Sequence, residues 1–195
     1  MLIGIMGGTF DPIHIGHLLA AETAAEEANL DEVWFMPANI PPHKASAPLA
    51  TSQQRLEMVQ CAIESRPSFK AIDDELKRGG TSYTFDTVAR LQQQYPDYRF
   101  HYIIGADMVM YLPKWYRIEE LAQLVTFIGV GRPGYELNLT ELPPALRDRV
   151  QLVSMPAMEV SSTDIRKRRQ EGRSIRYRVP ESVRQYIERK GLYES

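Results

Sequence analysis

Residues 2–17 read Leu-Ile-Gly-Ile-Met-Gly-Gly-Thr-Phe-Asp-Pro-Ile-His-Ile-Gly-His. The apolar run Leu2–Met6, interrupted only by Gly4, predicts a short buried parallel strand. The apolar and small residues from Ile15 to Ala28 predict a helix. A strand, a turn and a helix start form a βα unit, and the free backbone N–H groups at the carboxyl end of such a strand can bind an anion.

The turn between this strand and this helix has the residues of a phosphate site. Gly7 and Gly8 permit a positive φ and let a phosphate approach the backbone. His14 and His17 are one helical turn apart, so both imidazoles can face one ligand. The glycine spacing matches neither G-x-G-x-x-G nor the P-loop. A zinc site is a minor alternative, since no third ligand has suitable spacing nearby.

Composition places the chain among ordinary globular proteins. It has 195 residues, 44% hydrophobic and 25% charged, with a net charge of −2. We expect one domain over residues 1–195, with a C-terminal helical part at about 161–195. The near-neutral charge gives no support for nucleic-acid binding, and no signal peptide or membrane span is predicted. Cys61 is the single cysteine, which excludes an internal disulfide and fits a cytoplasmic protein.

Apolar runs alternate with helical patterns along the rest of the chain, which is typical of a parallel sheet covered by helices. We therefore predict a Rossmann-like, doubly wound α/β fold with five to six parallel strands, helices on both faces and a small C-terminal helical part. Phe85, Val88, Ala89 and Leu91 mark one face of a predicted helix, which Ser82 or Thr84 can cap. The predicted strands are Leu2–Met6, Glu32–Met36, Phe69–Ile72, Arg99–Ile104, Val125–Val130 and Val150–Val153.

Two further segments carry candidate phosphate-binding residues. The Pro-rich loop 37–48 follows a predicted strand and contains Lys44, which can lie at the same edge of the sheet as the histidines. Residues 160–166 begin a helix with three consecutive hydroxyl residues, and Arg166 follows one turn later. N–H and O–H donors beside a guanidinium can hold a polyphosphate. The basic residues 167–169 beyond Arg166 are predicted to be solvated.

Residues 7–17 resemble the G-G-T-F-D-P-x-H-x-G-H signature of the nucleotidyltransferase α/β phosphodiesterase superfamily. Ser161–Arg166 resembles the distal S-S-T-x-I-R motif of the same superfamily. Within it, the chain is similar to the nicotinate-nucleotide adenylyltransferase family nearly from end to end. The stretches that point to this family include residues 82–87, Ser-Tyr-Thr-Phe-Asp-Thr, and 112–116, Leu-Pro-Lys-Trp-Tyr.

The resemblance implies adenylyl transfer from ATP to nicotinate mononucleotide by direct in-line attack, with Mg²⁺ held through the ATP phosphates and no metal ligand from the protein. It implies catalytic roles for His14, His17, Lys44 and Arg166. The ATP contacts that it implies are Gly8, Thr9, Phe10, His14, His17, Gly105, Asp107, Arg132, Ser162, Thr163, Ile165 and Arg166. The nicotinate mononucleotide contacts that it implies are Gly7, Gly8, Thr9, Lys44, Thr84, Trp115 and Tyr116.

Two other functions stay open from the sequence. A sister adenylyltransferase that uses nicotinamide mononucleotide or phosphopantetheine would keep both phosphate motifs and change only the acceptor pocket. A non-catalytic nucleotide sensor would have no reason to keep His14, His17, Lys44 and Arg166 together. A homo-oligomer is compatible with the sequence, and no pattern in it indicates which state forms.

Overall fold

The computed structural model describes residues 1–40, 47–131, 134 and 137–194. Its centre is a parallel sheet with the strand order β3-β2-β1-β4-β5-β6. The strands are β1 (Leu2–Gly8), β2 (Glu32–Pro37), β3 (Phe69–Ala71), β4 (Arg99–Gly105), β5 (Val125–Gly131) and β6 (Val150–Ser154). Each predicted strand is confirmed to within two residues at either end.

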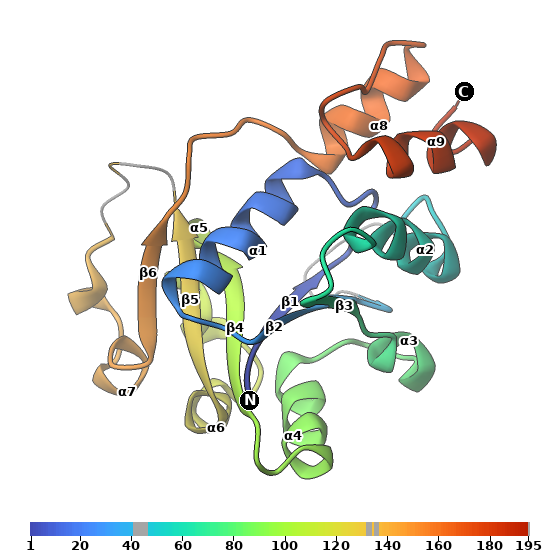
Figure 1. Ribbon diagram of the computed structural model, residues 1–195. Coiled ribbons are helices and arrows are strands. Elements are labelled where there is room, and N and C mark those ends of the chain that lie inside the picture. The colour runs from blue at the N-terminus through green and yellow to red at the C-terminus, as the bar shows by residue number, and fades with distance from the viewer. Residues whose placement is uncertain (41–46, 132–133, 135–136, 195) are drawn as a thin grey trace.

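Nine α-helices lie in the described part of the chain, and they cover both faces of the sheet (Figure 1). The helices are α1 (Ile15–Glu27), α2 (Ser52–Ile63), α3 (Asp74–Arg78), α4 (Thr84–Gln94), α5 (Ala106–Val109), α6 (Ile118–Leu124), α7 (Pro144–Arg147), α8 (Ser162–Gln170) and α9 (Glu181–Arg189). Short 3₁₀ turns span Leu112–Lys114 and Leu139–Glu141. The doubly wound α/β prediction is confirmed.

The strands β1, β2 and β5 are buried on both faces, because their successive side chains point to opposite faces and helices cover each face. On β2, Val33 and Phe35 pack in one buried cluster, whereas Trp34 and Met36 pack in the other. The first cluster joins the sheet to α1, α2 and α9, and the second joins it to α4, α6 and α7. Burial on both faces explains why the strands are continuous apolar runs rather than alternating ones.

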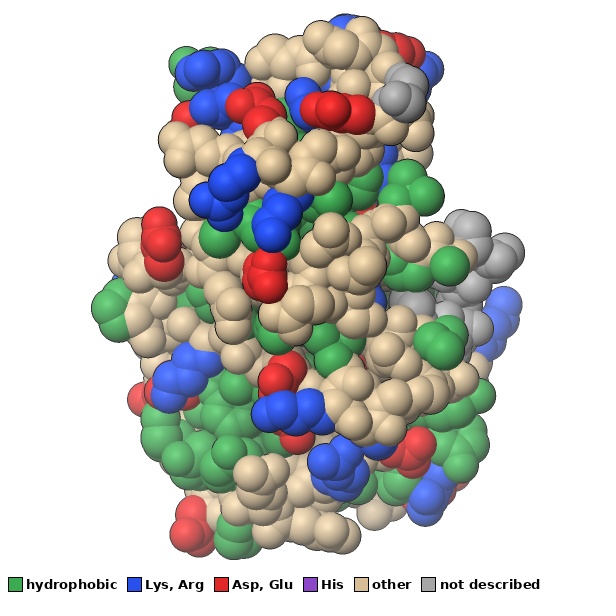
Figure 2. Space-filling view, turned by 90° about the vertical axis from the view of Figure 1, so that its right-hand side faces the viewer, with side chains coloured by type: hydrophobic (Ala, Val, Ile, Leu, Met, Phe, Trp, Pro, Cys, Tyr) green, Lys and Arg blue, Asp and Glu red, His purple; other side chains and the backbone are tan. Residues whose placement is uncertain are grey.

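The C-terminal helices α8 and α9 stand at one end of the molecule, and an extended connection joins β6 to α8 (Figure 1). In Figure 2 they form the upper lobe, where Lys and Arg side chains are frequent. Helix α9 packs on α2, and the Ser182 hydroxyl donates to the carbonyl of Cys61 at 2.7 Å. The prediction that residues 167–169 are simply solvated is wrong for Arg169, whose largely buried guanidinium pairs with Glu194.

Candidate active site

The loop after β1 turns at Phe10, and its two glycines have a different role from the predicted one. Both Gly7 and Gly8 lie in the extended strand β1, and the residue with a positive φ is Phe10, at 49°. The prediction that the glycines supply a positive φ is therefore wrong. A Cβ on Gly7 would lie 2.1 Å from the Tyr102 hydroxyl, and one on Gly8 would lie 2.9 Å from the Phe10 ring. Glycine is required here because two neighbouring side chains occupy the Cβ positions.

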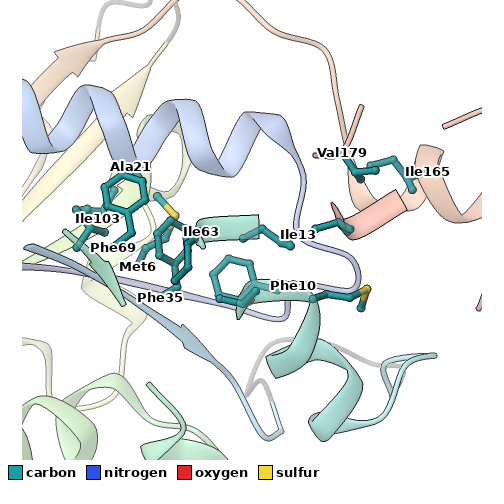
Figure 3. Packing of buried hydrophobic residues seen from close by; sticks show 14 of the residues in the cluster. Met6, Phe10, Ile13, Ala21, Phe35, Ile63, Phe69, Ile103, Ile165 and Val179 are labelled. Atoms are coloured by element: carbon teal, nitrogen blue, oxygen red, sulfur yellow. The ribbon is translucent and has the colours of Figure 1, made fainter. Parts of the chain in front are cut away.

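The Phe10 ring anchors this loop in the core. Its side chain is 2% exposed and points into the buried cluster with Ile13 (Figure 3). A ligand can therefore meet Phe10 only through its backbone. The apolar side chains below the loop fix its path, and the backbone amides and the histidines remain on the side of the cavities described below.

Helix α1 begins directly after His14, which is its N-cap residue. The His14 backbone N–H donates to Nδ1 of His17 at 3.2 Å, and the two imidazoles stack with centroids 3.7 Å apart. Because Nδ1 of His17 accepts this bond, the neutral His17 ring carries its proton on Nε2. The start of the helix therefore sets which nitrogen of His17 can donate to a ligand.

His14 is held neutral by burial. Its side chain is 7% exposed, and desolvation lowers its pKa from 6.5 to about 4. Among the described residues, its buried Nδ1 has no hydrogen-bond partner. A Cβ on Gly16 would lie 3.1 Å from this nitrogen, so the absence of a side chain at Gly16 leaves room for the ring. The His14 ring also lines the larger of the two cavities described below.

The distal motif joins this loop through two hydrogen bonds. The Ser162 hydroxyl donates to the carbonyl of Pro12 at 2.8 Å, and Nη1 of Arg166 donates to the carbonyl of Asp11 at 2.8 Å. Ser161 caps α8 by accepting from the Asp164 N–H at 3.1 Å, as the capping pattern predicts. The two sequence motifs, about 150 residues apart, thus form one continuous structure at the carboxyl edge of the sheet.

Two cavities of about 450 and 550 Å³ meet at this edge. Gly7, Tyr102 and Trp115 line both of them. Six of the seven residues predicted for nicotinate mononucleotide line the smaller one: Gly7, Gly8, Thr9, Thr84, Trp115 and Tyr116. Four of the residues predicted for ATP line the larger one: His14, His17, Gly105 and Asp107. The predicted site residues therefore separate into two adjoining compartments.

The smaller cavity combines aromatic faces with a helix N-terminus. Trp115 packs edge-on against Tyr102, with ring centroids 5.7 Å apart, and the Thr84 hydroxyl donates to the Tyr102 hydroxyl at 3.4 Å. Thr84 begins α4, whose first N–H groups have no intrahelical acceptor. The predicted Ser82 or Thr84 cap is wrong, since Tyr83 is the N-cap residue. An aromatic face beside free amides suits a flat ring that carries an anionic group.

Buried Glu75 supports the turn that precedes α4. Its carboxylate accepts from the Thr87 hydroxyl at 2.8 Å, and burial raises its pKa. The Ser82 hydroxyl accepts the N–H of Asn39 at 2.9 Å, which links the same turn to the end of β2. These contacts fix the position of residues 82–84, which line the smaller cavity.

The larger cavity has polar groups at one side and an apolar wall at the other. Gly105 ends β4 and Asp107 lies in α5 directly after it, and a Cβ on Gly105 would lie 2.4 Å from the Asp107 carboxylate. The apolar wall consists of side chains from three separate segments, among them Ile104, Met108, Val130, Met155, Met158 and Val160. An apolar wall opposite a carboxylate suits a nucleoside, with its base on the wall and its sugar hydroxyls near the acid.

Several predicted residues lie elsewhere. Lys44 and Arg132 fall outside the described residues. The hydroxyl of Thr163 accepts from Arg166 at 3.3 Å, and the side chain of Ile165 is fully buried in the core. Contact of ATP with Phe10, Ser162, Thr163, Ile165 and Arg166 stays a prediction.

The structure adds lining residues that sequence reasoning missed, namely Tyr102, Lys114 and Glu75. Lys114 had a usable signal, since it lies inside the Leu-Pro-Lys-Trp-Tyr stretch. Tyr102 had none, because it reads as one more core residue of a strand. In the part of the chain that the structure describes, no group of three or more His, Cys, Asp or Glu side chains could hold a metal ion. A search of the same residues finds no helix long and apolar enough to span a membrane.

Comparisons with known proteins agree with this architecture. The cytidylyltransferase-like family profile matches residues 5–168. A probable nicotinate-nucleotide adenylyltransferase of Oceanobacillus iheyensis is 51% identical over 191 residues, which cover 98% of this chain and 96% of that protein. A protein of the same description from Bacillus anthracis is 50% identical over 193 residues, 99% of this chain and 98% of the relative.

A solved structure shares the fold. The nicotinic acid mononucleotide adenylyltransferase of Plasmodium falciparum, complexed with NaAD, has a TM-score of 0.80 at 21% identity, covering 98% of this chain and 97% of that one. At this level of sequence identity, the similarity shows that the two chains share a fold.

The doubly wound sheet, the histidine pair and the two adjoining cavities at its carboxyl edge, together with these relatives, place the chain among the nucleotidyltransferases. The chain belongs to the cytidylyltransferase-like family and, within it, to the nicotinate-nucleotide adenylyltransferases.

Proposed function

We propose that this chain transfers the adenylyl group of ATP to nicotinate mononucleotide, forming nicotinate adenine dinucleotide and pyrophosphate. The observation that carries this function is the meeting of the two cavities at Gly7, beside the histidine pair. Two nucleotides bound in adjoining compartments have their phosphates at the shared edge. The relatives at about 50% identity, which align with the chain over almost its full length, support the choice of acceptor.

The larger cavity binds ATP in this proposal. The adenine lies on the apolar wall near Met155 and Met158, and the ribose hydroxyls donate to the Asp107 carboxylate. The α-phosphate then lies at the histidines. The β- and γ-phosphates extend toward Arg166, with Lys44 as a further predicted contact, and Arg132 is predicted to border the adenine.

The smaller cavity binds nicotinate mononucleotide. The pyridine ring lies against Trp115, and the N–H groups at the start of α4 donate to the nicotinate carboxylate. The phosphate of the mononucleotide points toward Gly8 and Thr9, which line the same cavity. Lys114, also in this lining, supplies a positive charge for an anionic substrate.

The reaction needs positioning more than acid–base chemistry. A phosphate oxygen of the mononucleotide is already ionised, so it attacks the α-phosphorus of ATP in line, the bond to the bridging oxygen breaks, and pyrophosphate leaves with the electron pair. Negative charge builds on the α-phosphate as this happens. Nε2–H of His17 donates to that phosphate, and the His14 ring, which stacks on His17 and lines the same cavity, is the second predicted donor.

We propose Mg²⁺ as the cofactor, bound by the phosphates of ATP. The side chains of His14 and His17, which line the larger cavity, are imidazoles, and these suit phosphate oxygens rather than a hard cation. When bound, Mg²⁺ neutralises charge on the pyrophosphate that leaves. We also propose that residues 1–195 act as one domain, and a cytoplasmic location stays a prediction.

Pyrophosphate release tests the function. Purified protein is incubated with ATP and Mg²⁺, alone and with nicotinate mononucleotide, nicotinamide mononucleotide or phosphopantetheine. We expect release that depends on the acceptor and is fastest with nicotinate mononucleotide. Faster turnover of either other acceptor would reassign the enzyme to a sister activity, and ATP binding without release under any condition would indicate a sensor.

A further inference from the structure

Asp11 lies in the loop after β1, residues 9–14, which we call the phosphate loop. It is buried and forms hydrogen bonds with distant parts of the chain. Its side chain is 5% exposed. One carboxylate oxygen accepts from the Ala50 N–H at 3.1 Å and from the Tyr193 hydroxyl at 2.7 Å, and the other accepts from the Leu49 N–H at 2.9 Å. Its backbone carbonyl accepts from Arg166 at 2.8 Å. Every one of these donors lies at least 38 residues away in sequence.

A second buried group, the Arg55 guanidinium, holds the same loop at Thr9. Arg55 of α2 is 1% exposed, and its Nη1 donates to the carbonyl of Thr9 at 2.7 Å. Burial lowers the pKa of this guanidinium, and the charge of Asp11 partly opposes that effect. The backbone between β1 and His14 is thus fixed through its carbonyls and one carboxylate. At the end of this segment, the His14 N–H donates to Nδ1 of His17.

The Tyr193 hydroxyl reaches Asp11 because the chain reverses after α9. Gly191 has φ 58° and the Leu192 N–H donates to the carbonyl of Ile187 at 3.0 Å, so the tail folds back under the helix. Arg169 of α8 pairs with Glu194 and holds the tail from the other side. The Tyr193 side chain is 7% exposed, and burial together with the Asp11 charge raises its pKa, so the hydroxyl stays protonated and donates.

Resting on the adenylyl transfer proposed above, we infer that Tyr193 is a positioning residue: its hydroxyl, through Asp11, holds the loop that carries His14 and His17. Asp11 is three residues before His14, and Pro12 between them is held by Ser162. A shift of the Asp11 carboxylate therefore moves the start of α1 and the imidazole pair. A displacement of about 1 Å at reacting groups can lower turnover by ~10²-fold. The C-terminal tail is in this way part of the active site without touching a substrate.

The test compares two tyrosines that make the same kind of bond. Tyr193→Phe removes only the hydroxyl that binds Asp11. Tyr186→Phe, the matched control, removes a hydroxyl that donates to the carboxylate of Glu57 at 2.5 Å, also between the C-terminal region and α2 but away from the phosphate loop. Both variants lose one tyrosine–carboxylate hydrogen bond, so we expect similar decreases in the melting temperature.

Steady-state kinetics and histidine NMR give the readout. We expect Tyr193→Phe to lower kcat at least ~10-fold while KM for ATP changes less than ~3-fold, and Tyr186→Phe to keep kcat within ~2-fold of the wild type. In ¹⁵N-histidine spectra, Tyr193→Phe should shift the Nδ1 signal of His17, which accepts the His14 N–H, and Tyr186→Phe should not.

Equal kcat values for both variants, or an unchanged His17 signal in Tyr193→Phe, would overturn the positioning role. If the wild type itself forms no dinucleotide, the proposed function has failed, and the NMR comparison still decides whether Tyr193 holds the loop. A chain that ends at Leu192 provides a second variant, since it removes the tyrosine and Glu194 together. It should show the same His17 shift, and a wild-type spectrum from this shortened chain would also overturn the inference.

Discussion

His17 illustrates how a backbone contact can prepare a side chain for chemistry. Because its Nδ1 accepts the His14 N–H, the neutral ring carries its proton on Nε2, the nitrogen that we propose donates to a phosphate. The spacing of the two histidines could be read from the sequence, but the tautomer could not. It depends on the exact start of α1, and helix boundaries are set by the folded structure as much as by the local residues.

The His17→Ala variant tests this role at the level of one residue. Removing a donor to a developing phosphate charge typically costs ~3–4 kcal/mol of barrier, so we expect kcat to fall at least ~10²-fold. Binding of a non-hydrolysable ATP analogue, measured by calorimetry, should stay within a few-fold. His101→Gln is the control, since His101 of β4 lies outside the lining of both cavities. Unchanged turnover in His17→Ala would refute the role.

His14 gives a prediction for stability against pH. Its pKa is about 4 in the folded protein and 6.5 without the burial, so between these values the unfolded chain binds the proton that the folded chain excludes. Unfolding free energy should therefore fall as pH falls from 6.5 to 4, and at pH 5 this group should account for about 2 kcal/mol of the loss. Urea unfolding at pH 7 and pH 5 measures it.

His14→Gln removes this titration and keeps a polar side chain. The difference in unfolding free energy between the two pH values should therefore be smaller in the variant than in the wild type. Glu75, whose pKa burial raises, titrates in both proteins and cancels in the comparison. The same decrease in both proteins would contradict a buried, neutral His14.

At the level of elements, strands and helices could be predicted well, and turns less so. Continuous apolar runs identify strands that are buried on both faces, and this pattern needs only local sequence. The turn after β1 was harder. Phe10 adopts a positive φ, which non-glycine residues seldom do. Position 7 requires glycine because a Cβ there would clash with the Tyr102 hydroxyl on the neighbouring strand β4. The clash with Tyr102 can be recognised only once the pairing of β1 with β4 is known.

A double-mutant cycle separates the two explanations for Gly7. A Cβ there would lie 2.1 Å from the Tyr102 hydroxyl, so Gly7→Ala should lower the unfolding free energy by about 1–3 kcal/mol. Tyr102→Phe alone should cost about 1 kcal/mol, since it removes a bond with Thr84. On the Gly7→Ala background the same change should recover stability, measured by urea unfolding. Additive losses would instead indicate that the backbone conformation requires glycine.

At the level of the whole molecule, the site is assembled from segments that only the complete fold brings together. The parallel topology places the ends of β1 and β4 at one edge, and this much follows from the sequence. The contacts that hold the distal motif and the C-terminal tail against the phosphate loop could not be predicted from the sequence. Tyr193 is 182 residues from Asp11, and no periodicity or motif marks such a pair.

The same assembly explains why the two motifs occur together. Ser162 and Arg166 hold the carbonyls of Pro12 and Asp11, so the distal motif supports the histidines besides its predicted contact with ATP. The residues proposed to bind the acceptor, by contrast, come from the start of α4 and from the loop after the 3₁₀ turn Leu112–Lys114, where Thr84 and the pair Trp115 and Tyr116 lie. A different acceptor can therefore be accommodated by changes at these residues while the histidine pair and the distal motif stay the same.

Transfer of a labelled adenylyl group in a competition assay tests the central claim most directly. The purified protein is given Mg²⁺, ATP labelled with ³²P at the α-phosphorus, and equal concentrations of nicotinate and nicotinamide mononucleotide, and the products are separated by chromatography. The predicted result is label mainly in nicotinate adenine dinucleotide, with unlabelled pyrophosphate released. Label mainly in nicotinamide adenine dinucleotide, or in AMP without any dinucleotide, would contradict adenylyl transfer to nicotinate mononucleotide.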